Sequence, residues 1–141
     1  MQQGAQQGHQ QGSLPPEVSS ALQQYVQVLA TSRSLDELTT RFGPMAGGTL
    51  VFEDGRLRET VTQMPLKKDW NNVRFYRQPP EVTRVDVTAQ RTHGHGPSAL
   101  TGTEFKVWIG KVDPSQGMPA PITLLVAEGQ RGARVVGVGS L

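Results

Sequence analysis

The chain has 141 residues, with 14 Lys and Arg against 12 Asp and Glu, and it contains no cysteine. This length fits one domain, and a net charge of +2 is too small to indicate a nucleic-acid-binding protein by itself. The lack of cysteine excludes disulfides, thiolate zinc sites and cysteine nucleophiles, and no apolar run is long enough for a transmembrane helix.

The first thirteen residues repeat a short unit of two glutamines, a glycine and one variable residue, from Gln2 to Ser13. The repeat offers almost no apolar surface to offset the entropy of ordering, so residues 1–13 are predicted to be a disordered tail or linker. They lack the basic start and the apolar stretch of a signal peptide. Either they are a native N-terminus, or they link the domain to an upstream anchor. The remaining residues, 14–141, are predicted to form a single domain.

Two helices are expected next. Pro15 and Pro16 suit the first turn of a helix, and apolar residues then recur at helical spacing as far as Thr31. Ser34 and Glu37 form a capping box for a second helix, which Gly43 and Pro44 end.

The hydrophobic period changes after this point. Residues 49–53 and 56–63, joined by Asp54-Gly55, are typical of a β-hairpin with a two-residue turn. Residues 65–74 return to helical spacing around Trp70. Four strands are then expected, separated by connections rich in glycine and proline: residues 82–91, 103–112, 122–128 and 133–141.

The predicted order is therefore α-α-β-β-α-β-β-β-β, an α+β domain with N-terminal helices packed on a curved antiparallel sheet. Over residues 14–141 this order resembles the NTF2-like (cystatin-like cone) superfamily, by topology and not by a signature motif. Two alternatives remain. A β-sandwich with a helical N-terminus would need residues 65–74 to be a strand or loop, and a barrel decorated with helices would need the last strand to pair with the first.

The last strands carry apolar residues on both faces, whereas a sheet with one wet face alternates apolar with polar. One face must meet the helices, and the other needs a cover too. The first predicted hairpin, a second copy of the chain or another protein subunit would supply it, and we expect a second copy, because NTF2-like domains often dimerise through the outer sheet face. The residues expected at this homodimer interface are Trp108, Leu125, Val136 and Val138. The alternative is that Trp108 is a core residue beneath a loop.

His93 and His95 are two residues apart, a spacing that on a strand would let both bind one metal ion. Glycines and Pro97 surround them, so the segment is typical of a loop between strands. Neither a third histidine in the folded part nor a carboxylate nearby in sequence completes a site. They are weak metal candidates, and no cofactor is expected.

Asp69, Tyr25 and Tyr76 are the candidates for catalysis. NTF2-like enzymes resembling ketosteroid isomerase, scytalone dehydratase or polyketide cyclases place an Asp or His base with a Tyr or Asn donor in the mouth of the cone, and these three residues would imitate that arrangement. A structural explanation competes, because Asp69 lies early in a predicted helix, where the helix dipole favours a carboxylate.

The middle of the chain is basic, but Glu81 and Asp86 interrupt it, so a solvated face is favoured over a nucleic-acid site. Phosphate-binding loops, nucleophile elbows and zinc-protease motifs are absent from the sequence. We therefore expect a non-enzymatic protein–protein assembly module, with a small-molecule-binding or acid–base enzyme as the alternative. The element order is also similar to that of the periplasmic domains of VirB8-type conjugation proteins, which implies a bacterial, extracytoplasmic secretion complex, although their Asn-Pro-x-Gly motif is missing here.

Overall fold

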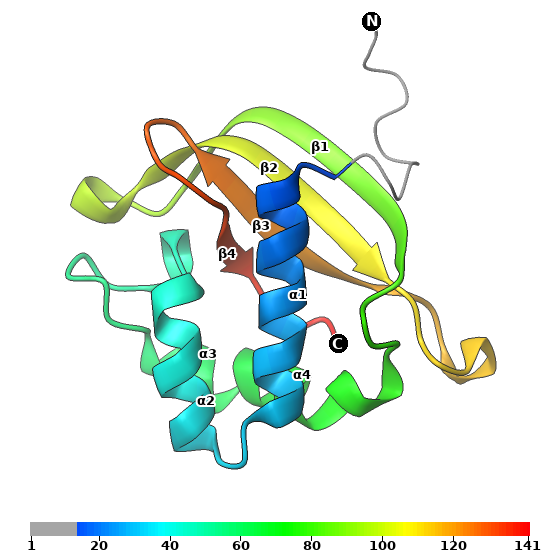
Figure 1. Cartoon of the computed structure of the whole chain (residues 1–141). Helices are drawn as coiled ribbons and strands as arrows, with labels where there is room; N and C mark the ends of the chain where they lie inside the picture. Colours follow the sequence, from blue (N-terminus) through cyan, green and yellow to red (C-terminus); the bar gives the residue numbers. More distant parts are fainter. Residues whose placement is uncertain (1–13) are drawn as a thin grey trace, which may run out of the picture.

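The computed structural model describes residues 14–141, so the prediction for residues 1–13 lies outside it. The helices precede the sheet in the chain and lie against one of its faces (Figure 1). The helices are α1 (Pro16–Thr31), α2 (Leu35–Phe42), α3 (Glu59–Gln63) and α4 (Pro65–Asn72). The strands are β1 (Val82–His93), β2 (Leu100–Ile109), β3 (Ala120–Ala127) and β4 (Arg134–Gly137). The α+β class is therefore confirmed, and among these helices none combines the length and hydropathy that a bilayer crossing requires.

Helix α1 is the main helical contact of the sheet and lies across it in Figure 1. Its N-terminus carries Pro16 in the first turn, and its last turn closes where Ser32 N–H donates to Val28 O at 3.1 Å. The helical stripe expected from the sequence is buried: Val18, Ala21, Leu22, Tyr25, Val28 and Leu29. Burial of this stripe against β3 and β4 builds the principal core.

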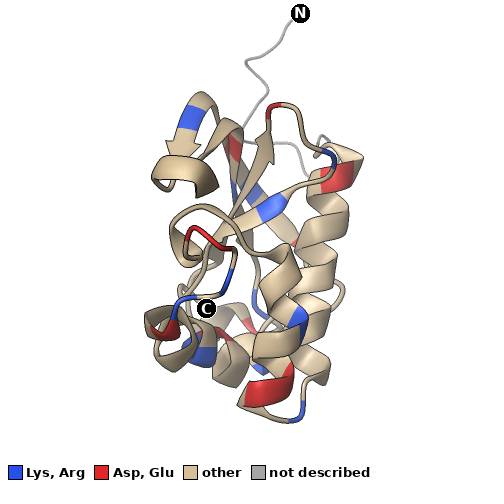
Figure 2. Cartoon of the chain, turned by 90° about the vertical axis from the view of Figure 1, so that its left-hand side faces the viewer, with Lys and Arg blue, Asp and Glu red and all other residues tan. Residues whose placement is uncertain are grey.

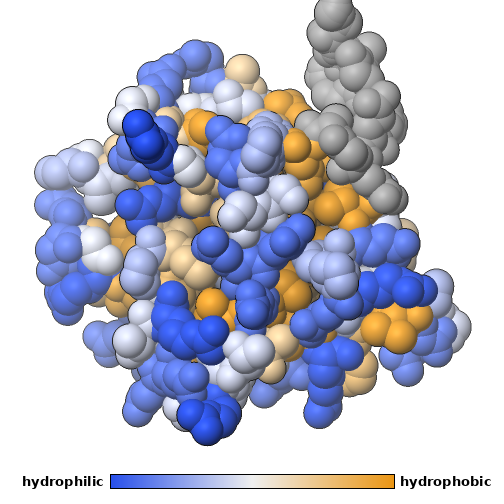
Figure 3. Space-filling model, in the orientation of Figure 1, coloured by the Kyte–Doolittle hydropathy of each residue, from blue (hydrophilic) through white to orange (hydrophobic). Residues whose placement is uncertain are grey.

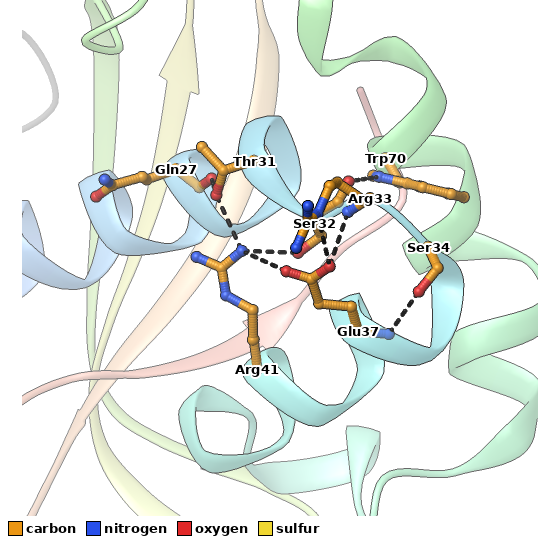
Figure 4. A network of polar contacts seen from close by, with 8 residues as sticks. All are labelled: Gln27, Thr31, Ser32, Arg33, Ser34, Glu37, Arg41 and Trp70. Atoms are coloured by element: carbon orange, nitrogen blue, oxygen red, sulfur yellow. Dashed lines mark hydrogen bonds and ion pairs between the residues drawn. The ribbon is translucent and has the colours of Figure 1, made fainter.

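The corner between α1 and α2 is held by polar contacts (Figure 4). Ser34 caps α2 by accepting the Glu37 N–H at 3.1 Å, as the capping box predicts. Arg41 Nη1 reaches back to donate to Thr31 Oγ1 at 2.9 Å. Trp70 Nε1, on α4, donates to the Ser32 carbonyl at 3.1 Å, which ties a third helix to the same corner.

The four strands form one antiparallel sheet in the order β1-β2-β3-β4. Phe105, Val107 and Ile109 of β2 face the helices and are buried, which makes this the inner face. Two register shifts bend β1, and at the second of them Gln90 has φ 57°. Figure 1 shows the resulting curvature of β1 and β2 over the helices.

The expected hairpin at residues 49–63 is wrong in its second half. A tight turn at Asp54-Gly55 does form, but only one bridge, Val51 to Leu57, joins its two sides. Residues 59–63 are helix α3, because a helical turn places Val61 in the core. Within residues 14–141 the order is therefore four α-helices followed by four strands. The predicted order, on which the NTF2-like resemblance rests, differs from the observed one between residues 49 and 63.

A second, smaller core lies on the outer face of the sheet. It contains Leu125, Ala127 and Val136, with Leu100 packed against them. The segment after α2 packs on this smaller core, since a Cβ placed on Gly47 would lie 2.9 Å from Leu100 Cδ1 and one on Gly48 would lie 3.5 Å from Val136 Cγ1. Part of the outer face is thus covered by the chain itself.

Candidate functional site

The most densely bonded polar group of the interior is Asp69, whose side chain on α4 is 0% exposed. Its Oδ2 accepts the Tyr25 hydroxyl at 2.5 Å and the Gly139 N–H at 2.9 Å. Its Oδ1 accepts the Leu141 N–H at 3.0 Å. Each carboxylate oxygen is therefore bonded to donors of the chain itself, and those donors come from α1 and from the segment after β4.

Burial dominates the electrostatics of this cluster. It raises the pKa of Asp69, and the hydrogen bonds from Tyr25, Gly139 and Leu141 act in the opposite direction. Burial also raises the pKa of Tyr25 well above its ordinary value, and the adjacent carboxylate adds to this. The pKa of Tyr76 is raised by burial first and by Asp69 second. The raised pKa values of Tyr25 and Tyr76 keep both hydroxyls neutral, and the carboxylate of Asp69 is favoured by its hydrogen bonds against the effect of burial.

Tyr76 belongs to the same cluster, but its hydroxyl does not bond to Asp69. Its hydroxyl donates to the Leu141 carbonyl at 3.2 Å, and Lys68 Nζ donates to the Gly139 carbonyl at 3.1 Å. The three residues singled out from the sequence thus lie together, and what they hold is residues 139–141. Asp69 is the fifth residue of α4 and is buried, so its hydrogen bonds explain its presence better than a helix dipole does.

The two histidines are not brought together on one site. His93 is the last residue of β1 and not a loop residue, and its Nε2 lies 2.8 Å from Glu104 Oε1 on β2. Arg91 Nε lies 3.5 Å from the same oxygen. His95 lines a separate cleft. Within residues 14–141 no cluster of three or more His, Cys, Asp or Glu side chains could hold a metal ion. The carboxylate partner was missed because it lies across the sheet, and strand pairing is the signal that finds it.

A cleft of about 540 Å³ opens between the segment after α2, the β1–β2 connection and the start of β4. Glu53, Leu100 and Arg134 are among its lining residues, and Arg134 Nη1 is already bonded to the Pro44 carbonyl at 2.7 Å. Asp69, Tyr25 and Tyr76 do not line this cleft. The candidate catalytic groups and this open space therefore lie in different parts of the molecule.

The basic residues of the middle segment are interspersed with acidic partners. Arg77 pairs with Glu81 at 3.3 Å and Arg84 with Asp86 at 2.9 Å. On the side of the molecule seen in Figure 2, residues of both signs likewise lie interspersed. On the helical side seen in Figure 3, hydrophilic residues dominate and apolar ones show between them. On the side of residues 14–141 that Figure 2 shows, the basic residues do not form the continuous stripe typical of a nucleic-acid site.

The four residues expected at a homodimer interface have different surroundings. Leu125 is 0% exposed and Val136 is 3% exposed in the smaller core, so the chain itself covers them. Val138 is half-buried against the main core. Trp108 is half-buried on the outer face of β2, where Arg84 Cζ lies 4.3 Å and Lys106 Nζ 5.4 Å from its ring centroid. Of these four side chains, Trp108 and Val138 are partly accessible to solvent. The homodimer itself stays a prediction.

Neither a protein-family model, nor a curated protein, nor a solved structure matches this chain. The function is therefore inferred from the residues of the chain alone.

Proposed function

We propose that this protein is a non-enzymatic assembly module that binds protein subunits through its sheet. These subunits include a second copy of the chain. The surface offered to other subunits is the outer face around Trp108.

The observation that carries this proposal is the setting of Trp108. Its ring is half-buried near the end of β2, opposite Arg84 on β1 and Pro121 on β3, and it keeps exposed area on the face away from the helices. Arg84 and Lys106 both lie over the ring. Tryptophan and arginine side chains dominate the energetics of many protein interfaces, since they combine apolar area with hydrogen-bonding capacity. A cation–π cluster on a solvent-facing sheet is suited to contact with a protein surface.

The interior supports the same function. An acid–base enzyme needs a carboxyl group that is open to a substrate, whereas the oxygens of Asp69 are bonded to Tyr25, Gly139 and Leu141. Asp69 acts in this geometry as an anchor for residues 139–141. The resemblance to NTF2-like assembly domains of bacterial secretion complexes agrees with the proposal, but it supplies no site residue.

Site-specific photo-crosslinking of the full chain in cells of its natural host tests the proposal. A photoreactive phenylalanine replaces Thr123, which lies on the outer face beside Lys106. The matched control places it at Gln23, exposed on α1. We expect protein adducts from position 123 that weaken on Trp108→Ala. Equal adducts from both positions, or none from position 123, would contradict the proposal.

A further inference from the structure

Strand β1 is one edge of the sheet, and among residues 14–141 no other strand pairs with its outer side. β2 packs along its length, and η3 (Gly48–Leu50) contacts it near His93. Figure 1 shows β1 along the outer margin of the sheet. An unpaired strand of this length presents a row of free backbone groups to which another strand can add.

The register shows which backbone groups are free. Glu128 N–H donates to Thr101 O, and this pair continues the register in which Gly102 lies opposite Ala127. Because hydrogen-bonded pairs alternate along antiparallel strands, odd-numbered residues of β2 direct their backbone N–H and C=O groups toward β3. Even-numbered residues of β2 therefore bond to β1, where Trp108 lies opposite Arg84 and Lys106 opposite Asp86. Val85 and Val87 consequently direct their N–H and C=O groups away from the sheet.

From this geometry we propose that β1 pairs with β1 of a second copy, antiparallel and about a two-fold axis at Val85, so that Arg84 of each copy lies opposite Asp86 of the other. This pairing rests on the proposed assembly function. It specifies that a second copy of the chain binds at the edge, with Val85 of one copy opposite Val85 of the other. Residues 82–88 would pair, and the pairing ends where the second irregularity of β1 begins, between Thr88 and Arg91.

Charge selects this register over its neighbours. Arg84, which is exposed, and Asp86, which is half-buried, lie on the same face of β1, with side chains 57% and 44% accessible. An axis at Asp86 would set two aspartates directly opposite each other, which is unfavourable. An axis at Val87 would set Arg84 opposite Gln90, whose φ of 57° breaks the extended strand. The axis at Val85 alone places opposite charges across the new pair twice.

Burial of apolar surface also favours the pairing of β1 with a second copy. Val87 is 37% exposed on the inner side of β1, and addition of a second strand would cover part of it. The pairing also makes one continuous sheet of the two copies, with both Trp108 side chains on its outer face. A dimer formed at the edge therefore leaves the face around Trp108 free for another subunit.

The test uses two charge-reversal variants of the full chain, Arg84→Asp and Asp86→Arg. Analytical ultracentrifugation over a concentration series measures the molecular mass of each in solution. Each variant alone would face like charges across the axis, whereas the two variants mixed restore opposite charges at both positions. We expect the dissociation constant of each single variant to rise about 10- to 100-fold over wild type, and the mixture to recover dimers. Val87→Pro, which removes an outward N–H and not a bond to β2, should weaken the dimer as well, with circular dichroism confirming its fold.

Dimers that persist unchanged in all three variants would overturn the edge pairing while leaving self-association intact. A wild-type monomer at every concentration would also overturn it, and adducts from position 123 would then support only the binding of other protein subunits. Single variants that lose the dimer and a mixture that does not recover it would overturn the Val85 register.

Discussion

Tyr25 on α1 donates a 2.5 Å hydrogen bond to the carboxylate of Asp69 on α4, across 44 positions of sequence. The same carboxylate holds Gly139 and Leu141 through their backbone N–H groups. One buried side chain thus joins the first helix, the last helix and the segment after β4, and Leu141 packs in the main core.

Asp69→Ala should lower the free energy of unfolding by about 3–5 kcal/mol, because it leaves a buried hydroxyl and two buried N–H groups without their acceptor. Asp36→Asn, at an exposed carboxylate in the first turn of α2, is the control and should cost less than about 1 kcal/mol. Urea unfolding measures both. Equal costs would show that Asp69 is not an anchor.

Tyr25 should make the fold sensitive to alkaline pH. Burial, aided by Asp69, raises its pKa above the ordinary 10.0, so above that pH the unfolded state holds fewer protons than the folded state and the free energy of unfolding falls as pH rises. The contribution of Tyr25 is complete below pH 10 and is lost as pH approaches its folded-state pKa. Urea titrations above pH 10 should therefore show a shallower decline for Tyr25→Phe than for wild type, with a residual slope from Tyr76. A slope unchanged by the substitution would be inconsistent with a shifted Tyr25.

Gly48→Ala should destabilise the protein more than Gly55→Ala. Both glycines have positive φ, 64° and 88°, so both substitutions carry the same kind of backbone strain, about 1 kcal/mol. A Cβ at Gly48 would lie 2.6 Å from His93 Cβ, whereas one at Gly55 meets open space. Overpacking should add about 1–3 kcal/mol at Gly48 alone. Thermal unfolding of the two variants compares them, and equal losses would rule out the close approach of η3 to β1.

Trp70→Phe should cost about 1–2 kcal/mol, since it removes the donor to the Ser32 carbonyl together with part of a packed ring. The control is Trp108→Phe, on the outer face, which should cost less. Chemical denaturation provides the comparison. A larger loss at Trp108 would make that residue part of the core.

Local signals predicted most of the helices and strands. The prolines at the start of α1, the Ser34 cap of α2 and the glycine- and proline-rich connections between the strands each act within a few residues, and the structure agrees with them. The segment at 59–63 was mispredicted because its alternation suits a strand, while the packing of Val61 selects a helical turn. Tertiary burial outweighed local preference there.

The sites depended on contacts that sequence spacing does not show. Asp69, Tyr25 and Tyr76 lie close together, but Gly139 and Leu141, whose N–H groups donate to Asp69, come from a segment expected to be strand. Glu104 was missed as the partner of His93 because the two meet through the β1–β2 register. Leu125 and Val136 were assigned to a partner surface, whereas the curvature of the sheet lets the chain cover them itself.

Self-association of the full chain is the part of the proposed assembly function that the pairing of β1 requires. Its direct test is the sedimentation mass of wild type and of Trp108→Asp from low to high micromolar concentration. We expect a reversible dimer for both, because Trp108 lies one strand in from the β1 edge. A wild type that stays monomeric throughout would contradict self-association, and a dimer lost only in Trp108→Asp would place the second copy on the outer face instead of the edge.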